Sequence, residues 1–263
     1  MPGVLGRVRL LPPPPIRRRF PGGGRCPGPT GGGQLHPSPA NHRRGPPTYL
    51  RDQEIDAHVA GVATALLRPT GHQATLATVP KKLLAVRAGL ASYGRNNLAY
   101  VPGLGSFHGL VALLIDAPPA DDPWRAPAVL QQCAGCSCCR EACPTGAIER
   151  GRFLVPAERC LTFWNEKPGS EPFPAWIEPA WHTSLVGCLH CQLVCPANRQ
   201  AAQWAEGPAF TAEETARLLA GSALGDLPAP TQRKLTASGL ARLLDVIPRN
   251  LAALAAAAER RRR

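Results

Sequence analysis

Cysteines dominate the chemistry that this 263-residue sequence can perform. Nine of the ten cysteines lie between Cys133 and Cys195, and the remaining one, Cys26, stands alone in a Gly/Pro-rich segment. The basic N-terminus lacks the apolar stretch of a secretory signal, because Pro12–Pro15 and Arg17–Arg19 interrupt it. So many cysteines without a secretion signal argue against a disulfide framework and favour metal or redox chemistry.

The first cysteine motif reads C-x2-C-x2-C-x3-C-P when Cys138 is set aside. This spacing is the run found in bacterial ferredoxins. In that run three thiolates wrap one [4Fe–4S] cubane, and the fourth cysteine reaches the other cluster. Its members here are Cys133, Cys136, Cys139, Cys143 and the following Pro144.

A second motif has a similar set of cysteines, but a 27-residue insert, 161–187, follows its first cysteine, Cys160. Crossed ligation then assigns every cysteine of both motifs, four to each cubane. Cluster one takes Cys133, Cys136, Cys139 and Cys195, whereas cluster two takes Cys160, Cys188, Cys191 and Cys143.

The alternatives are zinc or unligated core thiols. Zinc favours two separated C-x2-C knuckles and has no need of a third cysteine two residues on. We predict that Cys138 is a surplus, non-ligating cysteine. His190 lies between two ligands, and we expect it to support them or to face solvent rather than to bind iron.

The insert contains five aromatic residues, which we expect to shield cluster two from water. A stacking platform for a nucleobase is the alternative. The aromatic residues are Phe163, Trp164, Phe173, Trp176 and Trp181.

Composition and periodicity divide the chain into four segments. We expect a disordered Pro/Gly/Arg-rich tail over 1–48, a partial α/β domain over 49–125, a double-cluster domain over 126–200 and a helical tail over 201–263. The fold class is therefore α+β, with a ferredoxin-like double-cluster domain.

Apolar periodicity and turn residues place the expected elements. Helices are expected from about Ile55 to Leu66, from Pro80 to near Gly94, and at 212–220, 231–245 and 249–259. Strands are expected at 98–101 and 110–115, joined by a Gly-rich turn that includes Gly103 and Gly105. Thr211 and Glu214 form a predicted capping box.

The net charge of +12 lies mostly in the ends of the chain. Residues 1–44 contribute +8 and residues 259–263 contribute +3, which leaves +1 for all the residues between them. We interpret the charge as solvated tails, with attraction to RNA phosphates as the alternative. No apolar run approaches the roughly 20 residues needed to span a bilayer, so a cytoplasmic protein is expected.

Beyond the cysteines, the chain resembles epoxyqueuosine reductase over roughly residues 50–260. The resemblance includes Ala88-Gly89-Leu90, Gly94-Arg95-Asn96-Asn97 and Gly105-Ser106-Phe107. It also includes both cysteine motifs, with Pro-Thr-Gly-Ala-Ile148 after the first and Gln192 inside the second. The segments Phe210–Thr215 and Pro248–Leu251 are similar to that family's helical C-terminal region.

The resemblance implies an iron–sulfur oxidoreductase of tRNA queuosine synthesis, with a HEAT-like helical end. Two [4Fe–4S] clusters would pass electrons from a ferredoxin- or flavodoxin-type donor to cobalamin, which removes the epoxide oxygen from tRNA-bound epoxyqueuosine. A monomer without membrane attachment is expected. The alternatives are a ferredoxin-like electron-transfer protein that needs no cobalamin, and a nucleic-acid-binding protein with a structural cluster.

The sequence departs from that family in two places. The family has a longer N-terminal domain, of which only about 49–125 has a counterpart here. Where the family has an aspartate, its proposed proton donor, this chain reads Thr75 to Pro80 without an acid. No catalytic residue and no cobalamin-binding residue is therefore assigned.

Overall fold

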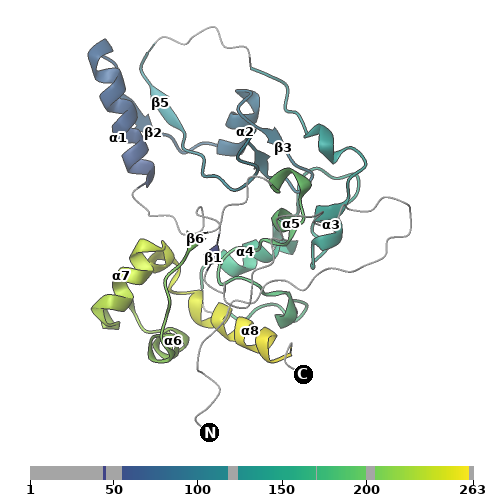
Figure 1. Cartoon of the computed structure of the whole chain (residues 1–263), viewed down its shortest axis with the longest axis vertical. Helices are drawn as coiled ribbons and strands as arrows, with labels where there is room; N and C mark the ends of the chain where they lie inside the picture. The colour runs from purple at the N-terminus through teal and green to yellow at the C-terminus, as the bar shows by residue number, and fades with distance from the viewer. Residues whose placement is uncertain (1–43, 46–54, 118–123, 170, 200–204, 261–263) are drawn as a thin grey trace.

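The computed structural model describes residues 44–45, 55–117, 124–169, 171–199 and 205–260 (Figure 1). Apart from Arg44–Gly45, the tail predicted over 1–48 lies outside these residues. The helices are α1 (Ile55–Leu67), α2 (Lys81–Arg87), α3 (Cys138–Ala142), α4 (Leu161–Glu166), α5 (His190–Leu193), α6 (Ala212–Leu219), α7 (Ala229–Ala237) and α8 (Ile247–Arg260). The strands are β1 (Arg44–Gly45), β2 (Ala74–Leu76), β3 (Ser92–Tyr93), β4 (Ala99–Tyr100), β5 (Leu113–Ile115) and β6 (Ala205–Glu206).

The described strands form three two-stranded antiparallel sheets, β1–β6, β2–β5 and β3–β4. Helices mixed with small sheets agree with the predicted α+β class. The expected strands at 98–101 and 110–115 correspond to β4 and β5. Strands β2 and β3 were not predicted, because two or three residues carry no readable alternation.

The helix predicted from Pro80 to near Gly94 is shorter than expected. It ends at Arg87, and Gly89 then adopts a φ of 76°, which a residue with a Cβ disfavours. The chain can therefore turn at once into β3. Ala85, Val86, Ala91, Tyr93 and Ala99 form a small core under this turn.

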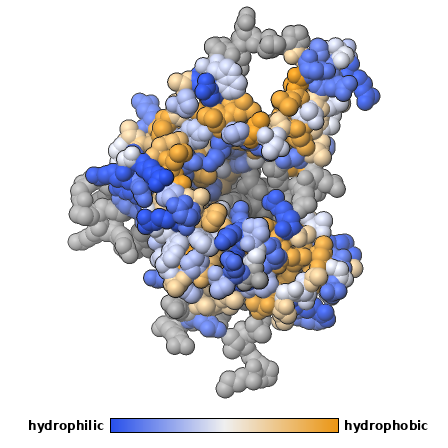
Figure 2. Space-filling model, turned by 180° about the vertical axis from the view of Figure 1, so that it is seen from behind, coloured by the Kyte–Doolittle hydropathy of each residue, from blue (hydrophilic) through white to orange (hydrophobic). Residues whose placement is uncertain are grey.

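Helix α1 and the β2–β5 ribbon lie apart from that core (Figure 1). No residue of α1 is buried, and its Leu66 is 75% exposed. Leu114 on β5 is 62% exposed, and Figure 2 shows apolar side chains on the surface of this part of the molecule. This part leaves a large apolar area open to solvent.

The C-terminal helices α6, α7 and α8 share a separate core. Its buried members are Leu218, Leu227, Leu235, Ile247 and Leu251.

The predicted capping box of α6 is confirmed. The Glu214 backbone N–H donates to Thr211 Oγ1 (3.1 Å), and the Thr211 N–H donates to Glu214 Oε2 (2.7 Å). The expected helix over 231–245 is wrong in its second half. Helix α7 ends at Ala237, because Gly239 takes a φ of 68° and a 3₁₀ turn, Leu240–Leu243, follows.

Candidate metal centre

The first cysteine motif forms a surface loop that ends in a short helix. Cys133 ends a 3₁₀ turn, Gln131–Cys133, and Gly135 turns the chain with a φ of 72°. Cys139 lies in the first turn of α3 and is 8% exposed. The loop therefore runs from the surface at Cys133 to the interior at Cys139 within seven residues.

The second cysteine motif lies on α5 and the turn that follows it. Cys191 is part of α5, and Cys195 precedes a 3₁₀ turn, Pro196–Asn198. Helix α5 packs against α3, so the two motifs lie side by side although 55 residues separate Cys133 from Cys188 (Figure 1).

The thiols fall into two groups by mutual electrostatic influence. Charges on Cys195, Cys133 and Cys136 act on the thiol of Cys139. Charges on Cys160 and Cys143 act on the thiol of Cys188. Cys191 lies where the groups meet, because charges on Cys188 and Cys143 of the second group and on Cys139 of the first group all act on its thiol. All eight are free thiols.

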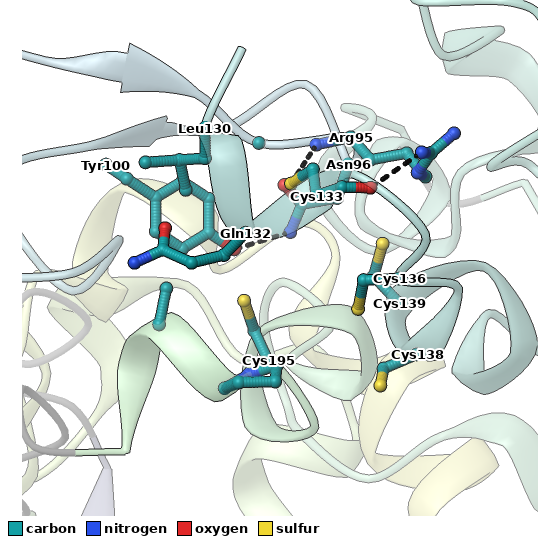
Figure 3. Close-up of a pocket in the computed structure, with 13 residues that line it drawn as sticks. Arg95, Asn96, Tyr100, Leu130, Gln132, Cys133, Cys136, Cys138, Cys139 and Cys195 are labelled. Atoms are coloured by element: carbon teal, nitrogen blue, oxygen red, sulfur yellow. Dashed lines mark hydrogen bonds between the residues drawn. The ribbon is translucent and has the colours of Figure 1, made fainter. Parts of the chain in front are cut away.

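Thiols of the first group line a hollow that is partly open to solvent. Figure 3 shows Cys133, Cys136, Cys139 and Cys195 around this hollow, and Cys138 also lines it, next to Cys139. Cys138 is 5% exposed and is not one of the eight free thiols. A hollow bordered by several thiols fits a polynuclear iron–sulfur cluster.

Burial makes these thiols hard to ionise without a metal. It raises the pKa of Cys139 to about 11 and that of Cys188 to about 12, and it also raises the pKa of Cys191 well above its usual value. Neighbouring thiolates add to each shift by repulsion. Iron binding must therefore supply the free energy that holds the thiolates together.

Arg95 connects the N-terminal part of the chain to the first motif. Its backbone N–H donates to Cys133 Sγ (3.4 Å), and its guanidinium Nη2 donates to the Cys133 carbonyl (2.8 Å). Hydrogen bonds of this kind orient a ligand and change the electron density on its sulfur.

A second connection joins the Gly-rich turn to the motif on α5. The Ser106 N–H donates to Asn198 Oδ1 (2.8 Å), and its hydroxyl donates to Gln192 Oε1 (3.1 Å). Asn198 Nδ2 in turn donates to the Gln192 carbonyl (2.9 Å). The segment predicted as a plain turn therefore anchors the second cysteine motif.

Sequence reasoning assigned no role to five residues that contact this centre. The sequence did contain a signal for these residues, because most of them lie in the segments that resemble epoxyqueuosine reductase. The residues are Arg95, Asn96, Tyr100, Ser106 and Asn198.

His190 supports the centre from outside. Its Nε2 donates to the Trp181 carbonyl (3.0 Å), which agrees with the expected supporting position. The aromatic residues of the insert pack mainly on one another: Trp164 meets Phe163 and Trp176 edge-on, at 5.4 and 6.3 Å between ring centroids.

Among the residues that the structure describes, no three His, Cys, Asp or Glu side chains are placed to share one metal ion. None of the described helices is long and apolar enough to span a membrane.

Known proteins similar to this chain are epoxyqueuosine reductases. The enzyme from Yersinia pestis is 36% identical over 125 residues, which is 47% of this chain and 28% of that relative. The enzyme from Escherichia coli K12 is 37% identical over 125 residues, which is 31% of its length. The chain thus matches about 30% of the length of these curated relatives.

Solved structures share the fold over a larger part of the chain. An epoxyqueuosine reductase from Bacillus subtilis superposes with a TM-score of 0.63 at 23% identity. The superposition covers 80% of this chain and 56% of the Bacillus subtilis chain. The enzyme from Streptococcus thermophilus gives a TM-score of 0.56 at 22% identity over 78% of this chain and 54% of its own.

Residues 132–198 match the family model described as a 4Fe-4S double cluster binding domain. With the thiol geometry, this match defines a double-cluster iron–sulfur protein. The curated relatives and solved structures that the chain resembles over part of its length are epoxyqueuosine reductases.

Proposed function

We propose that the eight free thiols hold two [4Fe–4S] clusters with crossed ligation. Cluster one takes Cys133, Cys136, Cys139 and Cys195, and cluster two takes Cys160, Cys188, Cys191 and Cys143. The electrostatic grouping of the thiols supports this division, because Cys195 acts on the first motif and Cys143 acts on Cys188. The spacing of both motifs supports it independently.

We further propose that the chain is an iron–sulfur oxidoreductase of the epoxyqueuosine reductase type, which acts in tRNA queuosine synthesis. The observation that carries this proposal is the pairing of the double-cluster domain with the Gly94–Tyr100 and Ser106 segments that hold it. Each [4Fe–4S] cluster supplies one site that accepts and releases a single electron. The low-potential donor would be a ferredoxin or flavodoxin.

In this proposal the residues of the chain position the ligands and limit the access of water. Arg95 orients Cys133, and the Ser106–Gln192–Asn198 contacts fix the turn after α5. Thr145 Oγ1 lies 3.4 Å from Cys143 Sγ and can donate to it. The ligands are thus held by segments on both sides of the cysteine motifs.

The substrate would be tRNA. One similar solved structure, with a TM-score of 0.59 at 23% identity, is an epoxyqueuosine reductase with an epoxyqueuosine-modified tRNA-Tyr stem loop. We also propose that the chain is a cytoplasmic monomer, that its segments divide at about 48, 125 and 200, and that 201–263 is a HEAT-like end. Among the residues that the structure describes, we assign none to cobalamin.

Three measurements test the proposed function on anaerobically purified full-length chain. Reconstituted protein should contain about eight iron and eight sulfide per chain, as two cubanes require. Absorbance titration should show binding of cobalamin. With reduced donor and cobalamin, the protein should convert epoxyqueuosine in tRNA to queuosine. Intact clusters without cobalamin binding would overturn the reductase assignment.

The alternative is electron transfer without cobalamin. The stretch that bears an aspartate in the family forms β2 and the turn after it, and Ala74 to Pro80 contains no acid. Reversible reduction of both clusters, with turnover of a redox partner in the absence of cobalamin, would favour this alternative.

A further inference from the structure

The turn between β3 and β4 places one arginine, Arg95, beside the first cysteine motif. The Gly94 N–H closes this turn by donating to the Leu98 carbonyl (2.8 Å). A Cβ at Gly94 would overlap the Tyr100 ring, so glycine at this position lets the turn pack closely. The backbone around Arg95 therefore sets where its side chain begins.

Strand β3 also connects this turn to the start of the first motif. The Tyr93 N–H donates to the Ala128 carbonyl (2.8 Å), and the Leu130 N–H donates to the Tyr93 carbonyl (2.8 Å). Cys133 follows Leu130 directly after, at the end of a 3₁₀ turn. These bonds fix the turn that carries Arg95 relative to Cys133.

The Arg95 side chain lines the hollow that the first group of thiols lines (Figure 3). Its Nη2 donates to the Cys133 carbonyl (2.8 Å), whereas its Nε is buried without a hydrogen-bond partner. Within the part of the chain that the structure describes, no carboxylate forms an ion pair with Arg95. A guanidinium is always protonated, so Arg95 brings an uncompensated positive charge to this hollow.

A charge of this kind needs an anion beside it. A charge that is partly removed from water costs free energy unless an opposite charge offsets it. A [4Fe–4S] cubane with four thiolate ligands is an anion, and its negative charge increases when it accepts an electron. A fixed positive charge at the hollow therefore stabilises the reduced cluster more than the oxidised cluster.

We propose that Arg95 is the counter-charge of cluster one and raises its reduction potential. The inference rests on the ligand assignment of the proposed function, and it needs neither cobalamin nor tRNA. The step that Arg95 favours is the transfer of one electron from the reduced donor to cluster one, without a proton. Arg95 keeps its charge in both states of the cluster, so loss of this charge lowers the potential.

The test is an EPR-monitored redox titration of the reconstituted full-length chain, with dithionite as the reductant. Arg95→Gln removes the charge and keeps an N–H group that can donate to the Cys133 carbonyl. It should lower one of the two potentials, with about a tenfold change in the reduction equilibrium, or about 59 mV for one electron. The other potential should stay unchanged. The signal that Cys136→Ser alters identifies cluster one, because Cys136 is assigned to that cluster alone.

Two further variants at this position separate charge from hydrogen bonding. Arg95→Lys keeps the charge and loses the planar fork, so it should retain most of the wild-type potential. Arg95→Met is a second neutral variant, and it should lower the same potential as Arg95→Gln. Iron content is measured first for each variant, so that a lost cluster is distinguished from a shifted one.

Arg233→Gln is the matched control. Arg233 is an exposed residue of α7, and its replacement makes the same change in net charge away from the hollow. This variant should leave both potentials unchanged.

Two results would overturn the inference and leave the proposed function standing. One is an unmoved potential in a neutral variant that retains about eight iron. The other is an equal decrease in Arg95→Lys and Arg95→Gln, which would assign the effect to local geometry rather than to charge. If the wild-type chain bound no pair of clusters, the ligand assignment would fail, and the inference would fail with it.

Discussion

At the scale of single residues, the thiols explain why the chain depends on iron. Desolvation by the surrounding protein raises the pKa values of Cys139 and Cys188 to about 11 and 12. Such thiols carry no charge at neutral pH, whereas a cluster ligand must be a thiolate. The Arg95 backbone N–H donates to Cys133 Sγ, and a donor in this position favours the ionised ligand.

Crossed ligation predicts what happens when a cysteine that binds the cluster of the other motif is removed. Cys143→Ala and Cys195→Ala should each lower the iron content below eight per chain and change the spectra of both clusters, because each residue joins one loop to the other cubane. Iron analysis with low-temperature EPR measures both effects.

Cys138→Ala is the control for this prediction, because Cys138 is not one of the eight free thiols. It should keep about eight iron per chain. If Cys195→Ala lost one cluster and left the other spectroscopically untouched, the crossed assignment would be contradicted.

At the scale of elements, the start of α8 clamps the aromatic insert that separates Cys160 from Cys188. Arg249 Nη2 donates to the Trp164 carbonyl (2.6 Å), and its guanidinium lies 4.5 Å from the centroid of the Phe173 ring. Asn250 Nδ2 donates to the carbonyls of Asn165 and Leu185, each at 2.8 Å. The helical end therefore positions two expected ligands of cluster two.

Asn250→Ala should destabilise this clamp. Asn250 is 1% exposed, and its loss leaves the buried Asn165 carbonyl and the part-buried Leu185 carbonyl without this donor, at about 1–3 kcal/mol for a buried group. We expect a lower denaturation midpoint and faster release of iron to a chelator, measured by absorbance. Ala252→Gln, at an exposed position of the same helix, should change neither.

His182 makes the insert sensitive to acid. Burial, the charge of Arg249 and the nearby His190 lower the pKa of His182 to about 4. The unfolded chain binds a proton at this histidine below its ordinary pKa of about 6.5, whereas the folded chain stays neutral until about pH 4. The free energy of unfolding should therefore fall as pH decreases from 6.5 to 4.

His182→Gln does not titrate at this position and should show a smaller decline across the same window. Denaturant titrations at several pH values between 4 and 7 measure the difference. Parallel pH profiles for the two proteins would show that His182 is not the source of the acid sensitivity.

At the scale of the whole molecule, the two cysteine motifs lie between two small apolar cores. One core is next to β3 and β4, and the other joins α6, α7 and α8. Segments 94–106 and 188–198 contact each other through Ser106 and Asn198, and Arg95 contacts Cys133 of the first motif. Iron should therefore hold the two parts together more than any single apolar contact does.

Removal of the clusters should loosen the middle of the molecule and leave the helical end largely folded. Hydrogen exchange by mass spectrometry should show lost protection over 94–106, 131–145 and 186–199, because the ligand loops lose their metal. Protection of α6 and α8 should persist, since their core includes Leu235 and Ile247 at 0% exposure. Uniform loss of protection over all helices would contradict this two-part description.

Local pattern was enough for several predictions about this protein. The spacing of Cys133 to Cys143 and of Cys188 to Cys195 indicated the double-cluster domain, because ligands of one loop must be close in sequence. The capping box at Thr211 and Glu214 and the helix that begins near Pro248 were also readable, since both depend on neighbours within one turn.

Only the tertiary structure decided which distant residues meet at the thiols. It brought Arg95 to Cys133, and it brought Ser106 to Gln192 and Asn198 beside the second motif, although about 40 to 90 residues separate the partners. It also ended α2 at Arg87 and broke the predicted helix over 231–245 at Gly239. The physical reason is range: spacing and capping act within a few residues, whereas burial and hydrogen bonds at the thiols depend on segments that pack only after folding.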